Sequence, residues 1–400
     1  MNKQQEPRLR FKGFMETWEE KTLNDVSEIF EYGLNAQAVN FDGVHKYIRI
    51  TDIDDESRQF LQENVTSPDV DFSKVDNYKL QKGDLLFART GASVGKSYLY
   101  NENDGLVYFA GFLIRAKLNK EVDDQFIFQN TLTNHFNRFV TLTSQRSGQP
   151  GINSKEYSKF EFLAPSLPEQ THLGLFFRRL DNQIAKSRAV LEKSRQLKKA
   201  MLAKMFPANG EKIPKIRFKG FEGEWESRRL GEIVDVVMGQ SPPSTSYTDN
   251  PNDFILVQGN ADMKNGKVCP RIWTTELTKQ GKVGDIIMSV RAPVGDVGKT
   301  DYDIVIGRGV CAIKGDEFIY QTLWKMKSDC YWDAVSSGST FEAVNSNDIK
   351  NAEVLIPPTP KEQIKIGNFF RQLDETIALQ SAEVEKLNQL KKGLLAAMLV

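Results

Sequence analysis

One long segment that occurs twice constrains the fold of this chain more than any other feature of its sequence. Residues 169–205 and 362–398 align at an offset of 193, with 20 identities in 37 positions. Each copy is preceded by a Ser-x-x-Glu or Thr-x-x-Glu spacing, in which both side chains satisfy backbone donors at a helix N-terminus. The sequence therefore predicts two long helices, at 166–206 and 357–400.

A narrow apolar stripe with a seven-residue period runs along both predicted helices. Such a stripe is typical of a coiled-coil seam, although the helices could each pack only against their own domain. In a parallel pair Lys198 would face Lys391 in one apolar layer, whereas an antiparallel pair puts the two lysines at opposite ends. We therefore expect antiparallel pairing. The residues predicted to form it are Phe177, Leu180, Ile184, Leu191, Phe370, Leu373, Ile377 and Val384.

The repeat extends into the regions before the helices. Residues 7–14, followed by Trp18, return as residues 214–221, followed by Trp225. Gly-Asp and Ser-Gly pairs then recur in the same order in both halves, while the sequence between them differs. The chain is therefore expected to contain two similar frameworks that carry different inserts.

The two central regions are predicted to be mixed in structure. Residues 84–88 and 285–290 resemble strands bounded by turns, whereas residues 126–142 and 318–334 resemble helices. The predicted fold class is α+β: two mixed α/β domains, each followed by a long helix, with the helices paired as an antiparallel coiled coil and a pseudo-two-fold internal repeat. The predicted segments are a first domain at 1–165, its helix at 166–206, a linker with the repeated N-terminal motif at 207–221, a second domain at 222–356 and its helix at 357–400.

Composition narrows the class of protein. There are 53 basic and 53 acidic residues, so no net charge marks a nucleic-acid binder. The basic run at 178–204 is explained most simply as a solvated helix face. Three widely spaced cysteines favour a reducing, cytoplasmic compartment. No apolar run approaches the roughly 20 residues that span a membrane, so we expect no membrane partner.

Sequence motifs for catalysis are incomplete. Residues 90–97 resemble a phosphate-binding loop, but Thr90 stands where the pattern requires glycine, and the matching loop of the second half begins with Pro293. A turn before a strand is the expected structure there, and nucleotide binding is the alternative. The Pro-Pro segments at 241–244 and 356–359 also do not match the Asn-Pro-Pro-aromatic motif of amino-methyltransferases. We expect neither catalytic residues nor a metal site in this chain.

The order of these motifs resembles the specificity subunit of type I restriction-modification enzymes over essentially the whole chain. The motifs that carry the resemblance, each weak alone but repeated in order, are Phe11-Lys-Gly-Phe14 with Trp18, Gly83-Asp84 and Gly284-Asp285, Ser147-Gly148 and Ser337-Gly338, and Leu167-Pro-Glu-Gln170.

The resemblance implies two target-recognition domains that each read half of a bipartite, asymmetric sequence in double-stranded DNA. The helices would act as a spacer and dock two methyltransferase subunits, and translocase-nuclease subunits would cleave DNA. S-adenosylmethionine, ATP and Mg²⁺ would then belong to those partners, and this chain would need no cofactor. The alternative in another class is a structural coiled-coil scaffold, which leaves the two unlike central regions unexplained.

Polar and basic residues in glycine-containing segments of the less similar regions are the candidate DNA contacts. Arg89 and Arg291 correspond between the halves in this alignment, so they could instead contact phosphate or support the fold. The candidates are Arg89, Thr90, Lys96, Arg146 and Gln149 in the first half and Lys264, Arg271, Arg291 and Lys299 in the second.

Overall fold

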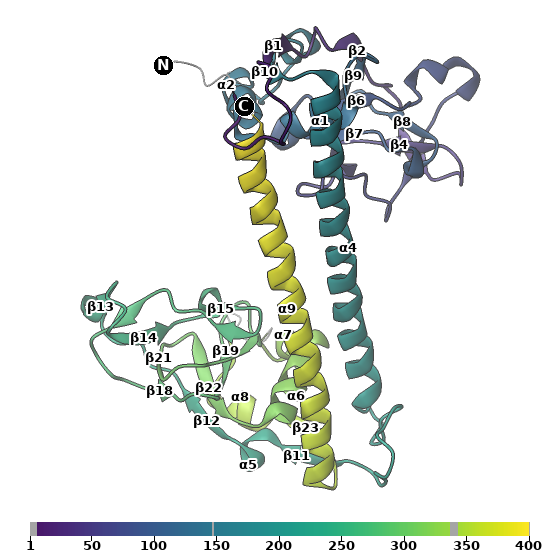
Figure 1. Cartoon of the computed structure of the whole chain (residues 1–400). Coiled ribbons are helices and arrows are strands. Elements are labelled where there is room, and N and C mark those ends of the chain that lie inside the picture. The colour runs from purple at the N-terminus through teal and green to yellow at the C-terminus, as the bar shows by residue number, and fades with distance from the viewer. Residues whose placement is uncertain (1–5, 146–147, 337–342, 400) are drawn as a thin grey trace. The chain divides into compact units, whose positions relative to one another are not determined.

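The computed structural model describes residues 6–145, 148–336 and 343–399 (Figure 1). The chain divides into two compact units, the first formed by Met1–Ala189 with Ala382–Val400 and the second by Val190–Ser381. Each unit therefore combines one central region with parts of both long helices. The domain limits inferred from the sequence treat the helices as separate segments, and they stay a prediction.

The first unit contains a mostly antiparallel set of sheets with short helices beside them. One sheet has the strand order β2-β9-β6-β7, a second has the order β3-β5-β4-β8, and β1 pairs with β10. The strands are β1 Glu19–Thr22, β2 Ser27–Tyr32, β3 Ala38–Asn40, β4 Lys46–Ile48, β5 Thr66–Pro68, β6 Asp84–Ala88, β7 Ser97–Leu99, β8 Val107–Phe109, β9 Leu113–Leu118 and β10 Glu161–Ala164. The short α-helices are α1 Asp124–Asn130, α2 Asn134–Thr143 and α3 Ser154–Tyr157.

Strand β6 explains why the predicted strand at 84–88 is a continuous apolar run. Leu85 and Phe87 point into a core shared with α1, α2 and the start of the first long helix. Leu86 and Ala88 point into a second core on the opposite face. Because successive side chains of a strand alternate between faces, a strand covered on both sides needs apolar residues at every position.

The second unit repeats part of this framework. Its sheets have the orders β12-β22-β19-β20-β16-β15 and β13-β17-β14-β21-β18, and β11 pairs with β23. The strands are β11 Glu226–Arg229, β12 Asp235–Met238, β13 Tyr247–Thr248, β14 Phe254–Val257, β15 Met263–Lys264, β16 Lys267–Val268, β17 Trp273–Thr274, β18 Gln280–Gly281, β19 Ile286–Ser289, β20 Val297–Lys299, β21 Ile304–Ile306, β22 Val310–Lys314 and β23 Glu353–Ile356. The short α-helices are α5 Leu230–Ile233, α6 Glu317–Ser328, α7 Tyr331–Ser336 and α8 Ser346–Lys350. The run β12-β22-β19-β20 is the counterpart of β2-β9-β6-β7.

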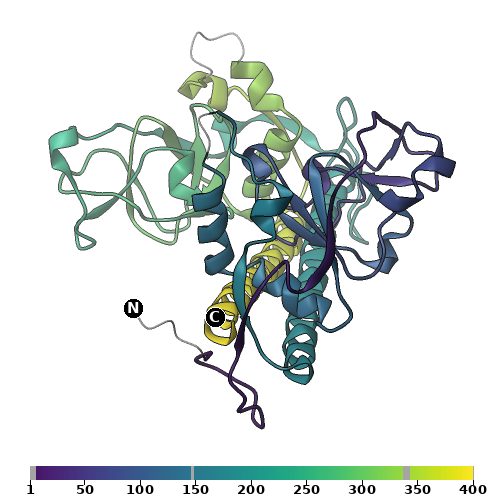
Figure 2. The same cartoon turned by 90° about the horizontal axis from the view of Figure 1, so that it is seen from above.

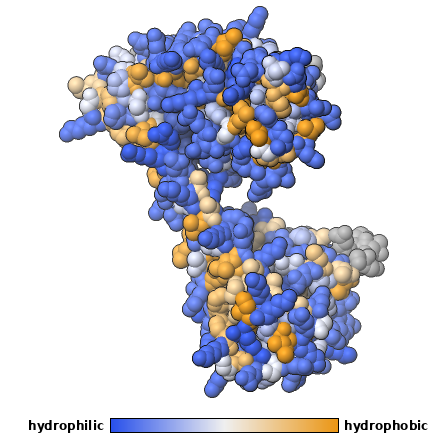
Figure 3. Space-filling view, turned by 90° about the vertical axis from the view of Figure 1, so that its right-hand side faces the viewer, coloured by the Kyte–Doolittle hydropathy of each residue, from blue (hydrophilic) through white to orange (hydrophobic). Residues whose placement is uncertain are grey.

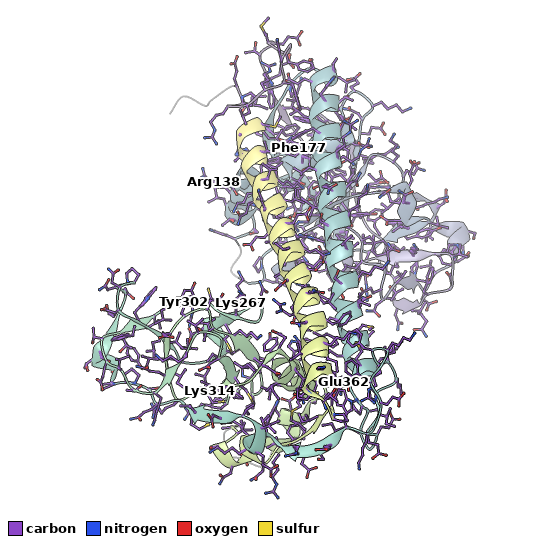
Figure 4. All side chains as sticks on the ribbon, turned by 60° about the horizontal axis from the view of Figure 1, so that its bottom comes forward. Arg138, Phe177, Lys267, Tyr302, Lys314 and Glu362 are labelled. Carbon is purple, nitrogen blue, oxygen red and sulfur yellow. The ribbon has the colours of Figure 1, made fainter. Side chains whose placement is uncertain are left out.

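The long helices are α4, Leu167–Met205, and α9, Pro360–Met398, each of 39 residues. In the first unit Phe177 of α4 shares a core with Leu395 and Met398 of α9, so the start of one helix lies beside the end of the other. In the second unit Met205 of α4 shares a core with Phe370 of α9, again with opposite helix ends together. The predicted fold class, with two mixed α/β parts and long helices, is confirmed. Figure 4 labels Phe177 on α4 and Glu362 in the first turn of α9.

Burial varies among the residues predicted to pair the helices. Phe177, Ile184, Leu191 and Phe370 are buried, and the other four are partly buried: Leu180, Leu373, Ile377 and Val384.

The segments predicted to be helical at 126–142 and 318–334 are mostly helical, but each is broken into two helices. In the first unit α1 ends at Asn130, and the Thr133 hydroxyl group accepts a hydrogen bond from the backbone N–H of Phe136 to begin α2. In the second unit Cys330 has a φ of 57° between α6 and α7. A left-handed residue interrupts a right-handed helix, and aromatic spacing does not report it.

The N-terminal motif and its repeat are anchored to the long helices. Both carboxylate oxygens of Glu169 accept hydrogen bonds from Arg10, at 2.8 and 2.7 Å, and Glu362 accepts equivalent bonds from Arg217, at 2.7 and 2.8 Å. The glutamates are 1% exposed. Their side chains thus bind arginine instead of the helix-capping N–H groups that the Ser/Thr-x-x-Glu spacing predicts.

The N-terminal segment also reaches the end of α9 within the first unit. The backbone N–H of Leu9 donates to the carbonyl oxygen of Ala397 over 2.9 Å. Figure 2 shows this dark purple segment passing close to the yellow end of α9. Within the described part of the chain, no helix has the length and apolar character needed to cross a membrane.

Candidate nucleic-acid interface

The loop after β6 brings several predicted DNA contacts together in the first unit. The backbone of Ala88 exchanges hydrogen bonds with the far side of the loop, donating to Lys96 O over 2.8 Å and accepting from Gly95 N over 3.1 Å. A 3-10 helix at Gly91–Ser93 turns the chain between these points. The segment at 90–97 is therefore a turn before β7, as the sequence predicts.

A second segment, which contains Gly151 and Ile152, pairs with this loop through its backbone. Thr90 forms an isolated antiparallel bridge with Gly151, and the Ile152 N–H donates to Arg89 O over 2.9 Å. The loop and this segment line an open cavity of about 290 Å³, whose walls are formed by Arg89, Thr90, Phe112, Gly151, Ile152 and Asn153. The arrangement thus places an arginine, a hydroxyl and an amide side chain around one hollow.

Arg89 is held between two aromatic rings. Its guanidinium carbon lies 5.1 Å from the centre of the Tyr32 ring and 5.7 Å from the centre of the Phe112 ring. A guanidinium group over an aromatic face is attracted to the ring while its edge stays able to donate. The Tyr32 hydroxyl accepts hydrogen bonds from the side chain and backbone of Ser154, and chiefly this side-chain bond, with help from Arg89, lowers the pKa of Tyr32.

The other candidates of the first half are placed differently. Lys96 is half-buried, forms an ion pair with Asp55 over 2.6 Å and donates to Ile53 O over 3.3 Å, so its cation already has partners. Gln149 is exposed, and a Cβ atom on Gly91 would lie 2.9 Å from its side-chain amide nitrogen. Arg146 lies outside the described residues.

In the second unit, the loop after β19 holds the corresponding place. Arg291 is exposed and forms an isolated antiparallel bridge with Ala343, and the Val344 N–H donates to Val290 O over 3.0 Å. These contacts repeat those of Thr90 with Gly151 and of Ile152 with Arg89. Thr90 is therefore the counterpart of Arg291.

The alignment of Arg89 with Arg291 is thus wrong by one residue. Arg89 corresponds to Val290, which is 3% exposed and belongs to the core of the second unit. The loop of the second unit is one residue shorter, because Ser289 N donates to Asp296 O where Ala88 N donates to Lys96 O. This shortening lies after Thr90 and Arg291, and the match of Gly83-Asp84 with Gly284-Asp285, continued without a gap, also places Arg89 opposite Val290.

The other three candidates of the second unit lie outside the loop that follows β19. Lys264 is exposed at the end of β15. Arg271 pairs with the buried carboxylate of Asp262 over 2.9 Å. Lys299 pairs with Glu317 and lies 5.1 Å from the centre of the Tyr320 ring. Among the described residues, Lys264 and Arg291 are consequently the second-unit candidates whose side chains form no ion pair.

Sequence reasoning missed Tyr32 and Phe112. They are 42% and 56% exposed, although aromatic residues in strand-rich regions are usually buried. Figure 3 shows a mostly hydrophilic surface on which hydrophobic residues form small patches. Nothing in the local pattern marks these two aromatics as exposed, since their exposure results from the neighbouring loops.

The comparisons with known proteins agree with this architecture. The family model for the type I restriction modification DNA specificity domain matches residues 15–193 and 222–389. The chain therefore belongs to the type I restriction-modification DNA specificity family, as the resemblance in the sequence indicates. It is a DNA-recognition component and not an enzyme.

Individual relatives extend over most of the chain. A putative type I restriction enzyme MjaX specificity subunit of Methanocaldococcus jannaschii is 26% identical over 402 residues, covering 96% of this chain and 93% of its own. The MjaVIII specificity subunit of the same organism is 19% identical and covers 86% and 84%.

Two solved structures share the fold. The S subunit of a type I restriction-modification system from M. genitalium has a TM-score of 0.70 at 15% identity and covers 99% of both chains. A chain from a study of complex assembly and conformational transition of the type I R-M system has a TM-score of 0.52 at 23% identity, covering 94% of this chain and 96% of its own.

Proposed function

We propose that the first unit reads one half of a bipartite, asymmetric DNA target and that the second unit reads the other half. The observation that carries this proposal is that the two units share a backbone framework but have different side chains at equivalent positions. Gly33 and Gly239 occupy the same place, because their N–H groups donate to Leu113 O and Val310 O at the ends of equivalent strands. The residues before them are Tyr32 and Met238, which differ in chemistry.

By the same comparison Phe112 of the first unit is equivalent to Gly309 of the second, and Arg89 is equivalent to Val290, because Arg89 N donates to Phe112 O and Val290 N donates to Gly309 O. Two units that share a scaffold but present different side chains at equivalent positions can recognise different base sequences, since base edges are read by a few side chains. A purely structural scaffold would not require this difference. Nucleotide binding is also disfavoured, because Lys96, the lysine of the loop that resembles a phosphate-binding loop, pairs with Asp55.

The candidate contacts divide into two roles in this proposal. The residues with polar groups at exposed or half-buried positions, which would contact bases or phosphates, are Arg89, Thr90, Gln149, Lys264 and Arg291. The partners of Lys96, Arg271 and Lys299 favour a supporting role, in which these side chains hold loops in place. Arg146 remains a candidate from sequence alone.

Catalysis would come from partners. Two methyltransferase subunits would bind S-adenosylmethionine and methylate adenine, and translocase-nuclease subunits would use ATP and Mg²⁺ in a cytoplasmic complex. The paired α4 and α9 helices would dock the methyltransferases and space the two reading units, with domain limits close to 1–165 and 222–356.

Reconstitution tests the proposal. The full chain is mixed with its methyltransferase partner, labelled S-adenosylmethionine and a library of DNA duplexes with randomised positions. The expected result is methylation of one split, asymmetric sequence, and none when either protein is omitted. Methylation that is independent of sequence, or methyl transfer by this chain alone, would contradict it.

A further inference from the structure

The aromatic cradle of Arg89, formed by Tyr32 and Phe112, is a structural feature that the first unit has and the second lacks. Phe112 is 56% exposed and Tyr32 is 42% exposed, so both rings border solvent, and Phe112 also lines the cavity of about 290 Å³. At the equivalent place the second unit has Met238, Val290 and Gly309. The cradle is therefore not required by the shared framework.

The guanidinium group in this cradle contacts the two rings but has few hydrogen-bond or ion-pair partners. Its Nε atom is buried and has no hydrogen-bond partner among the described residues. No ion pair of Arg89 with a described residue is present, in contrast to Lys96 nearby, whose cation pairs with Asp55. With no acceptor within the described chain bound to this side chain, its donors are not committed to an internal hydrogen bond and can be used by a ligand.

The backbone fixes the cradle from three sides. The Arg89 N–H donates to Phe112 O over 3.0 Å, and Arg89 O accepts from Ile152 N over 2.9 Å. The Tyr32 ring is held through its hydroxyl group by Ser154. Because the surrounding strands and loops set these positions, the arginine loses little side-chain freedom when it binds a ligand.

The chemistry of the cradle selects one kind of base. The edge of a guanidinium group matches two acceptors side by side, and in the major groove O6 and N7 of guanine provide that pair. An exposed phenylalanine next to the arginine can contact the methyl group of thymine or the face of a neighbouring base. Phosphate would be bound by an arginine as well, but it requires no aromatic ring beside it.

We propose that Arg89 reads a guanine in the half-site recognised by the first unit, with Phe112 packed against the neighbouring base and Tyr32 orienting the guanidinium group. This inference rests on the proposed function. It adds the base that is read, the two aromatic residues that present the arginine, and the absence of this contact in the other half-site.

The test compares variants of the full chain in complex with its methyltransferase partner on DNA with each target position randomised. Arg89→Lys keeps the charge but loses the paired donors, and Phe112→Leu keeps an apolar side chain but loses the ring. Arg138→Ala, which removes an exposed cation of α2, is the matched control. Thermal unfolding of each variant confirms that it is folded.

For Arg89→Lys we expect a roughly 5- to 150-fold loss of discrimination at a single G·C position of one half-site. Phe112→Leu should weaken preference at that position and its neighbour, and every position of the other half-site should be unchanged. Arg138→Ala should leave the whole preference unchanged.

Equal losses of affinity on all sequences for Arg89→Lys, with the dependence of binding on salt unchanged because the charge is kept, would show a phosphate contact and overturn the inference. Unchanged preference in both Arg89→Lys and Phe112→Leu would overturn it too. Failure of the unaltered complex to prefer any sequence is a different result, because that contradicts the proposed function itself.

Discussion

Lys391 Nζ lies 2.6 Å from Asp181 Oδ1, so an ion pair joins the end of α9 to the start of α4 within the first unit. Asp181 Oδ2 also accepts a hydrogen bond from Gln129 over 2.8 Å. The second unit repeats the arrangement: Lys198 Nζ lies 2.6 Å from Asp374 Oδ1, and Asp374 Oδ2 accepts a hydrogen bond from Gln321 over 2.8 Å. In both units the aspartate of a Leu-Asp pair on one helix, at 180–181 or 373–374, thus binds the first lysine of a Gln-Leu-Lys-Lys segment on the other helix, at 389–392 or 196–199.

The two copies of this network differ in burial, which predicts unequal effects of mutation. The side chain of Lys198 is 6% exposed and lies 4.3 Å from the centre of the Trp324 ring, whereas the side chain of Lys391 is 15% exposed. Asp374→Ala would leave Lys198 as a nearly unpaired buried cation, and we expect a loss of about 3 kcal/mol in the free energy of unfolding. Chemical denaturation measures it. Asp181→Ala is the control and should cost less; an equal or larger loss there would contradict the argument.

Stability should also depend on pH through Lys198. Burial lowers the pKa of Lys198 below its ordinary value of 10.5, despite the opposing effect of Asp374. Between the folded-state pKa and 10.5 the unfolded chain binds more protons, so the free energy of unfolding should rise with pH in that interval. The difference in unfolding free energy between the unaltered chain and Lys198→Met isolates this effect from other lysines. A difference that falls with increasing pH would be inconsistent with a lowered pKa.

The anchor of the N-terminal motif gives a third prediction. Arg10→Ala removes both hydrogen bonds to Glu169, a carboxylate that is 1% exposed, and should destabilise the first unit by about 3 kcal/mol. Amide hydrogen exchange should accelerate at Leu9, whose N–H bonds to the end of α9. Arg8→Ala is the matched control, since Arg8 forms one exposed hydrogen bond of 3.5 Å. Exchange at Leu9 that is equally fast in both variants would contradict an anchoring role for Arg10.

The proposed spacing role of the helices can be tested by lengthening both together. Seven residues are inserted between Ala189 and Val190 in α4 and seven between Ser381 and Ala382 in α9, which leaves the contacts inside each unit intact. A whole heptad preserves the seam and adds about 10 Å, or roughly three base pairs at about 3.4 Å each. Methylation of the library should show a longer unread spacer between unchanged half-sites. An active variant that keeps the original spacer would exclude the helices as the ruler, and insertion into α4 alone is the control.

The sequence by itself determined the two copies, the helix limits and the family. The segments predicted at 166–206 and 357–400 are helical at Leu167–Met205 and Pro360–Met398. Caps and heptad periods are local patterns, so a single chain displays them without knowledge of its neighbours. The strand at Asp84–Ala88 was likewise predictable, because a strand buried on both faces is apolar at every position.

Tertiary structure decided which polar groups meet. In the sequence Lys198 and Lys391 are exceptions in an apolar stripe, and only the folded chain shows that each binds an aspartate on the other helix. Glu169 has the spacing of a helix cap, yet a guanidinium group 159 residues away takes both its oxygens. The exposure of Phe112 depends equally on distant segments. Such pairings arise from long-range packing, and no local period or spacing encodes them.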